Sequence, residues 1–483
     1  MNKPILTFFF LLCCLGLQAQ VNDSTTRRRP DGYKNFRQNA MEQYESFKNQ
    51  AQSEFEQFLA EAWTEYHRFA GTNSIYSKSK PETIPANNLN AGSDAADAGF
   101  SVQDWNLPMT NDEAPATPGQ VKISFYGCPL SFSVPEALRV SVNGTREANV
   151  ARCYESMRKS GKTRILADEL DTKVFQMGLN EWGYFTLLRA IAEKTFTDMN
   201  DRVMFCFYML HSHGFKARIG RGQKSKQLML LLAIDNSKEV YSLSFFRFNG
   251  VKHYAVYGGQ EGEDVYSYNE KADQRSGKEL MLDFKQPLHM APCNKVRQLR
   301  WNKDGATLAL PYSTTHLRYY DDMPLTQFPV YAGTALPPEA QQVMDSAVNA
   351  LRQHLNERQI MEVLLHFVQN AFSYKIDEKQ FGREKYFFPE EVIGYPFSDC
   401  EDRAALFASL LRRYTHYELV GLVYSDHMAV GVCFDDGKQP EGLSFVHKGK
   451  TYVMCDPTYT NAPIGKVMPQ FSNAHFEIIE MPK

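Results

Sequence analysis

One segment near the C-terminus restricts the fold more than any other part of the chain. It runs from Tyr395 to Cys400 and leads directly into an apolar stripe at helical spacing. A proline does not fit deep inside a helix, so Pro396 predicts that this helix begins around Asp399 or Cys400. The buried stripe is expected to consist of Ala404, Phe407, Ala408 and Leu411. Cys400 is therefore predicted at a helix N-terminus, where the positive end of the helix dipole favours a thiolate.

Two apolar strands are predicted after this helix. The first begins at His427 and runs to Phe434, and the second ends at Asp456, where Pro457 stops it. A thiol, an imidazole and a carboxylate thus stand in this order at the ends of three consecutive elements. Covalent catalysis uses the same three groups as nucleophile, general base and orienting acid.

This arrangement resembles the transglutaminase-like branch of the papain-like cysteine enzymes, in which a cysteine opens a helix, a histidine begins one strand and an aspartate ends its neighbour. The resemblance covers approximately residues 336–483. It implies that Cys400 is the nucleophile, His427 the general base and Asp456 the orienting acid. Many members have a His-Ala-Trp sequence, whereas methionine and alanine follow His427 here. Helices followed by strands in this region predict an α+β domain.

The same chemistry needs hydrogen-bond donors for a developing oxyanion. The backbone N–H of Cys400, at the start of its helix, is one candidate. The resemblance implies a second donor from a side chain upstream of the cysteine, for which Tyr395 is the candidate. The alternative for Tyr395 is that it only packs beneath the loop. Asp402 and Arg403 are expected to form ion pairs on the helix surface.

Residues 119–290 are predicted to be a degenerate copy of the C-terminal domain. Both regions contain a helix that follows an aspartate and a set of strands, but the reactive positions of the first copy carry Met199, Gln227 and Gly258. None of these side chains can act as nucleophile, base or orienting acid. The alternative is a chance similarity between two α+β segments. If the repeat is real, Met199 should be buried and the two copies should share an apolar contact.

The length of 483 residues gives room for two to four domains. Residues 1–19 have the pattern of a signal peptide cleaved after Ala19, because a lysine precedes an apolar run that is too short to span a membrane. The alternative, a lipoprotein site at Cys13 or Cys14, lacks the small residue expected before it. The remaining predicted regions are a long amphipathic helix (20–70), a flexible linker (71–118), the degenerate domain (119–290), a β-rich connector of short strands (291–335) and the catalytic domain (336–483).

Composition argues against several classes of partner. The net charge is −3, without the basic excess of nucleic-acid-binding proteins. No other apolar run approaches the length of an integral membrane segment. Cysteine and histidine show no zinc-type spacing, so no metal and no cofactor are predicted. Self-association through the helix at 20–70 is an alternative to its docking on the body of the protein.

These features together predict an exported protein, located in the periplasm or outside the cell. The expected function is that of a cysteine enzyme that hydrolyses peptide or amide bonds of a peptide or protein substrate through a thioester. Two alternatives remain: acyl transfer to an amine, which cross-links proteins, and a non-catalytic two-domain binding scaffold with a relic triad.

Overall fold

The computed structural model describes residues 84–85 and 119–481, except 236, 249, 261–262, 268–276, 302–305 and 435–440. Residues 77–483 form one compact unit. The predicted signal peptide, the helix at 20–70 and nearly all of the predicted linker lie outside the described residues. The described chain is mixed α/β, as the predicted α+β class requires.

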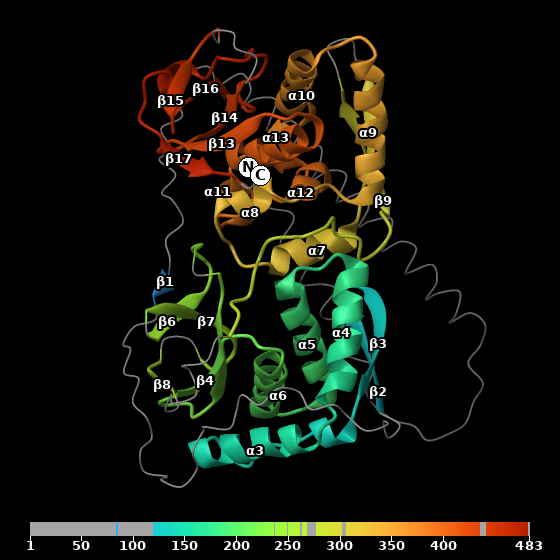
Figure 1. Ribbon diagram of the computed structural model, residues 1–483, viewed down its shortest axis with the longest axis vertical. Coiled ribbons are helices and arrows are strands. Elements are labelled where there is room, and N and C mark those ends of the chain that lie inside the picture. The colour runs from blue at the N-terminus through green and yellow to red at the C-terminus, as the bar shows by residue number, and fades with distance from the viewer. Residues whose placement is uncertain are drawn as a thin grey trace, which may run out of the picture. The chain divides into compact units, whose positions relative to one another are not determined.

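The N-terminal half begins with a hairpin and four helices, followed by a sheet (Figure 1). Tyr126 and Gly127 both have positive φ and form the two-residue turn of the hairpin. The elements are β1 (Ile84–Pro85), β2 (Gly119–Phe125), β3 (Cys128–Val134), η2 (Glu136–Leu138), α3 (Glu147–Lys159), α4 (Thr163–Met177), α5 (Glu181–Thr195), α6 (Met199–Ser212), β4 (Ala217–Gly222), β5 (Leu228–Ala233), β6 (Ser244–Phe248), β7 (Val251–Gly258) and β8 (Val265–Ser267).

The C-terminal half begins with a second hairpin, continues with helices and ends in a second sheet. Its elements are β9 (Lys295–Arg300), β10 (Thr307–Tyr312), α7 (Thr314–Asp322), α8 (Phe328–Ala332), α9 (Pro338–Arg352), α10 (Glu357–Ala371), β11 (Ser373–Tyr374), α11 (Asp377–Phe381), α12 (Pro389–Gly394), β12 (Phe397–Ser398), α13 (Cys400–Tyr414), β13 (Glu418–Val423), β14 (Met428–Cys433), β15 (Ser444–His447), β16 (Lys450–Cys455), η3 (Pro469–Phe471) and β17 (Glu477–Glu480).

The two main sheets share one topology. Without the short strand β1, the first sheet has the order β6-β7-β5-β4-β8, and the second has the order β15-β16-β14-β13-β17. Every neighbouring pair in both orders is antiparallel. In each half, one helix precedes the five strands in the chain and packs on the sheet: α6 in the first half and α13 in the second (Figure 1). The strands therefore match one for one, in chain order and in space.

The β-rich connector needs a correction. Residues 291–335 do contain the hairpin β9–β10, but the other described elements there are the helices α7 and α8 rather than short strands. Aromatic residues in α7 gave the segment its strand-like composition. The buried residues of α7 are spaced by three and four positions, which is a helical stripe. They are His316, Tyr319 and Tyr320.

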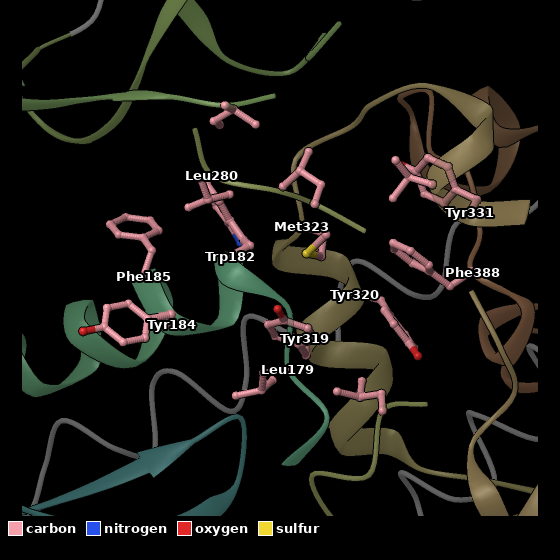
Figure 2. Close-up of a cluster of buried hydrophobic side chains, with 14 of the residues drawn as sticks. Leu179, Trp182, Tyr184, Phe185, Leu280, Tyr319, Tyr320, Met323, Tyr331 and Phe388 are labelled. Atoms are coloured by element: carbon pink, nitrogen blue, oxygen red, sulfur yellow. The ribbon is translucent and has the colours of Figure 1, made fainter. Parts of the chain in front are cut away.

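Helix α7 connects the two halves through aromatic side chains. Figure 2 shows Tyr319 on the side of Leu179 and Trp182, while Tyr320 faces Phe388. The ring of Tyr320 stacks on that of Phe388 with a centroid distance of 4.4 Å. Buried side chains from Val121 to Ile464 belong to one continuous hydrophobic cluster. The halves thus share a core, because each leaves apolar surface that the other covers.

Polar groups at the end of α7 reinforce this contact. The Asp322 carboxylate accepts hydrogen bonds from Tyr126, in the turn after β2, and from Arg189 of α5, the latter at 2.6 Å. Its backbone oxygen accepts from Trp182 Nε1 at 3.1 Å. Burial and the nearby Asp322 raise the pKa of Tyr126, so its hydroxyl stays a donor. Asp322 therefore binds three residues of the first half at once.

Gly258, at the end of β7, supports a prediction on stability. Its φ is +73°, and a Cβ there would lie 2.6 Å from the backbone oxygen of Leu228. Replacing Gly258 with alanine should lower the free energy of unfolding by about 2 kcal/mol or more, because strain and a backbone clash add. Gly214→Ala is the matched control, since Gly214 has φ +88° and no atom near the Cβ position. Urea unfolding of both variants measures the difference, and equal losses would show that the clash is absent.

Candidate active site

Helix α13 begins at Cys400 because its first turn is capped on both sides. The side chain of Asp399 caps the backbone of the first turn, and Asp402 Oδ2 in return accepts from the backbone N–H of Asp399 at 3.0 Å. The other oxygen of Asp402 accepts from the N–H of Phe387 at 2.9 Å. This reciprocal capping box holds Cys400 as the first helical residue. Its side chain is 1% exposed.

Asp402 and Arg403 are buried, so the expectation of surface ion pairs is wrong. Burial, followed by the repulsion from the nearby Asp399 carboxylate, raises the pKa of Asp402 well above its usual value. The Arg403 guanidinium donates to the backbone oxygen of Phe372 at 2.6 Å and to that of Gln369 at 3.4 Å. Burial lowers the pKa of Arg403 to about 10, which leaves it charged at neutral pH. Both residues thus stabilise the segment that presents Cys400.

The imidazole of His427 is bound to Asp456. His427 lies just before β14, and Asp456 directly follows β16, its neighbour in the sheet. His427 Nε2 lies 3.0 Å from Asp456 Oδ2. The ring of His427 also stacks on Phe471 with a centroid distance of 4.6 Å. Because Nε2 is engaged with the carboxylate, Nδ1 is the nitrogen that could exchange a proton with a nucleophile.

Asp456 is held as a carboxylate. Its Oδ1 accepts from the backbone N–H groups of Thr458 and Tyr459, both at 3.0 Å. Burial alone would raise the pKa of Asp456, but His427 and these hydrogen bonds outweigh it and lower the pKa. Gln369 Nε2 fixes the backbone here by donating to the oxygen of Asp456 at 2.9 Å. The orienting group is therefore charged and fixed.

The lowered pKa of Asp456 predicts a pH-dependent effect on stability. Asp456→Asn should reduce the free energy of unfolding by about 2 kcal/mol at pH 7, because the charge-assisted hydrogen bonds are lost. A carboxyl whose folded pKa is lowered stabilises above its unfolded pKa of about 3.9, and this contribution fades as pH falls through the folded value. Urea unfolding from pH 7 down to pH 3 should show the two proteins converging. Asp168→Asn, at an exposed position on α4, is the control, and a constant gap across the range would contradict the prediction.

Cys400 and His427 line one cavity of about 210 Å³. Both halves of the chain contribute to it, since Tyr241 belongs to the first half. The Cys400 thiol donates to Glu401 Oε2 at 2.8 Å. The lining residues are Tyr241, Gln327, Phe328, Glu384, Tyr386, Cys400, Glu401, Val423, Tyr424, Ser425, Asp426, His427, Met428, Glu477 and Ile479. The structure thus places the predicted nucleophile and base in the same cavity, with the predicted acid behind the base.

Tyr395 is not among the residues that line this cavity. Its ring stacks on Phe387 with a centroid distance of 4.8 Å and meets Phe381 edge-on. Tyr386 lines the cavity instead. Burial, with smaller contributions from Glu401 and Glu384, raises the pKa of Tyr386, so its hydroxyl remains a hydrogen-bond donor. The position of residues 379–386 between two helical stretches predicts that this segment borders the cleft, and Glu384 and Tyr386 do line the cavity. Nothing in the sequence singled out Tyr386 within it.

The corresponding residues of the first half also lie close together. Met199 begins α6, Gln227 precedes β5, and Gly258 ends β7, where it pairs with Met229. Asn200 Oδ1 accepts from the N–H of Leu228 at 2.8 Å, which joins the start of the helix to the start of the strand. Met199 is only half-buried, so the expectation of a buried side chain is wrong. Met199 still packs against the main hydrophobic cluster, as one of its partly buried members.

Two groups of carboxylates near Cys400 have the spacing of metal ligands. The first comprises Asp377, Glu384 and Glu401, and the second Asp377, Asp399 and Asp402; oxygens within each lie within 4.8 Å. Asp399 and Asp402 cap α13, and Glu401 accepts from the Cys400 thiol. Hydrogen bonds within the chain engage Asp377, Asp402 and Glu401, and we assign no metal to these groups.

Comparison of the chain with protein-family models, with curated proteins and with solved structures finds no match. Among the described helices, none has the length and apolar character needed to cross a membrane. All seven cysteines of the described ranges are thiols rather than disulfides.

Proposed function

We propose that the protein is a thiol-dependent hydrolase of peptide or amide bonds, with Cys400 as nucleophile, His427 as general base and Asp456 as orienting acid. The observation that carries the proposal is the His427–Asp456 pair, 3.0 Å apart, behind a cavity that Cys400 also lines. The resemblance to transglutaminase-like enzymes, drawn from the sequence, favours the same assignment. The shared topology of the two sheets supports the first half as a copy whose reactive positions were replaced.

The reaction balances with these three residues and water. His427 Nδ1 takes the Cys400 proton, and the sulfur attacks the carbonyl carbon of the amide. The imidazolium, stabilised by Asp456, then protonates the leaving amine, the C–N bond breaks and a thioester remains. Water, deprotonated by His427, then attacks the thioester carbon. The C–S bond breaks, the carboxylic acid product leaves, and the imidazolium returns its proton to the sulfur of Cys400. Acyl transfer to an amine differs only in the last step.

Two groups are suited to stabilise the oxyanion. The backbone N–H of Cys400 lies at a helix N-terminus, where the helix dipole favours negative charge. The Tyr386 hydroxyl, which burial keeps protonated, is the second donor of the proposal and takes the place of Tyr395. A fixed donor of this kind typically changes kcat by about 10²–10³-fold.

One observation favours the alternative of a non-catalytic binding scaffold. The Cys400 thiol donates to the Glu401 carboxylate at 2.8 Å, and a carboxylate at this position stabilises the protonated thiol over the thiolate. In a scaffold with a relic triad, Cys400 would stay unreactive at neutral pH. The two functions therefore differ in the nucleophilicity of a single sulfur.

Labelling with iodoacetamide at pH 7, followed by intact-mass measurement and peptide mapping, decides between them. An active nucleophile should react at Cys400 well before the other thiols. Burial raises the pKa of Cys153, Cys293 and Cys455 to about 12, with smaller contributions from nearby carboxylates, so these thiols give a low background. His427→Ala should slow the labelling of Cys400. Labelling of Cys400 no faster than that of Cys153 in the native protein would favour the scaffold.

A further inference from the structure

The cavity around Cys400 and His427 carries carboxylates on several sides. Four acidic side chains line it, and no lysine or arginine is among the described residues that do. The acidic residues are Glu384, Glu401, Asp426 and Glu477. A concave surface lined by charges of one sign strengthens the local electric field and raises the local concentration of ions of the opposite sign.

These carboxylates come from four separate segments around the reactive pair. Glu401 follows Cys400 on α13 and is 5% exposed, and its carboxylate lies within 4.8 Å of that of Glu384. Asp426 precedes His427. Glu477 begins β17, opposite Val423 of β13, and lies at the exposed rim. A substrate group in the cavity would therefore meet negative charge beside the nucleophile, beside the base and at the entrance.

Three basic side chains of the neighbouring segments have partners outside the cavity. Lys385 pairs with Glu391 at 2.8 Å and with Asp321 at 3.3 Å. Arg383 pairs with Asp321 at 2.8 Å, and Arg403 donates to backbone oxygens beneath the helix. None of these three cations is among the residues that line the cavity.

Aromatic side chains complete the lining. Tyr241, Tyr386 and Tyr424 all line the cavity. The face of a tyrosine ring attracts an ammonium or a guanidinium group. Aliphatic stems of lysine and arginine also pack well on such rings while the charged end stays near carboxylates. The combination of carboxylates and tyrosines in one cavity fits a long cationic side chain.

We propose that the substrate is a peptide with a lysine or arginine beside the amide that reacts, and that the cavity recognises this positively charged side chain. This inference rests on the proposed function for the reaction, but the recognition itself is a binding property that needs no turnover. Glu384 and Glu477 are the specificity-determining residues of the inference, since both line the cavity and neither belongs to the proposed triad.

The test uses the full chain with Cys400→Ala, which can bind but not react. Two fluorescent hexapeptides differ at one position, lysine in one and norleucine in the other, and anisotropy titrations give each Kd. The lysine peptide should bind at least about tenfold more tightly, and the ratio should fall at 0.5 M NaCl because salt screens the charges. Adding Glu384→Gln and Glu477→Gln together should reduce the preference, whereas Glu362→Gln, at an exposed position on α10, should not.

The outcomes separate this inference from the proposed function. Equal Kd values for the two peptides, or no binding of either, overturn the recognition of a cationic side chain, whatever the turnover. A preference for lysine that survives the double Glu→Gln change also overturns the assigned residues. A lysine preference in binding, combined with a wild-type chain that never cleaves the peptide, upholds the inference and refutes the hydrolase.

Discussion

Replacing Cys400 with alanine is expected to abolish turnover, with a loss in kcat of at least about 10³-fold, because no covalent intermediate can form without the sulfur. The fold should persist, since alanine is the best helix former and the change removes only a small side chain from α13. Hydrolysis of a peptide pool, followed by mass spectrometry, measures the activity, and circular dichroism checks the fold.

The matched control for this variant is Cys206→Ala. Cys206 is also a fully buried helical thiol, on α6 of the first half. This change should leave turnover at the wild-type level, although the loss of buried volume can cost about 1 kcal/mol of stability. Turnover by Cys400→Ala that matches the wild type would remove Cys400 from the mechanism.

Arg403→Met is expected to have the largest effect on stability, a loss of about 3–5 kcal/mol in the free energy of unfolding. Arg403 is 2% exposed, and its guanidinium donates to the backbone oxygens of Phe372 and Gln369. Its removal leaves these acceptors without that donor and the carboxylates of Asp399 and Asp402 without a nearby cation. Arg403→Lys should recover part of the loss, because it keeps the charge but not the planar fork of donors.

Urea unfolding at two pH values tests this account of Arg403. Burial raises the pKa of Asp402, so the folded chain keeps this proton to a higher pH than the unfolded chain does. A raised folded pKa means that stability falls as pH rises, and the loss in Arg403→Met should therefore be smaller at pH 5 than at pH 8. Arg164→Met, at an exposed position on α4, should change stability by no more than about 0.5 kcal/mol. A loss of that size in Arg403→Met would mean that the buried charge is not needed.

The sequence predicted the local structure around the reactive residues more reliably than their surroundings. Pro396 and the helical stripe placed the start of the helix at Cys400, and strand patterns placed His427 and Asp456 at the ends of neighbouring strands. These predictions depend on local steric rules and on periodicity, which a sequence carries directly.

The surroundings depend on contacts between distant segments. Tyr386 faces the cavity and Tyr395 packs on Phe387, although both are tyrosines in the segment before Cys400. Arg403 is charged, so its sequence pattern favoured the surface, yet tertiary packing buries it. Composition alone could not decide these cases, because the same residue types serve at the surface, in the core and in a cavity.

The position of α7 has a consequence for how the chain could be divided. Asp322 binds three residues of the first half, and Tyr320 stacks on Phe388 of the second. The cavity that Cys400 lines includes Tyr241 of the first half. A fragment cut at residue 336 would expose the aromatic surface under Phe388 and would lose a wall of its cavity. A chimaera that exchanged one half alone would therefore have to supply matching partners for Asp322, Tyr320 and Tyr241.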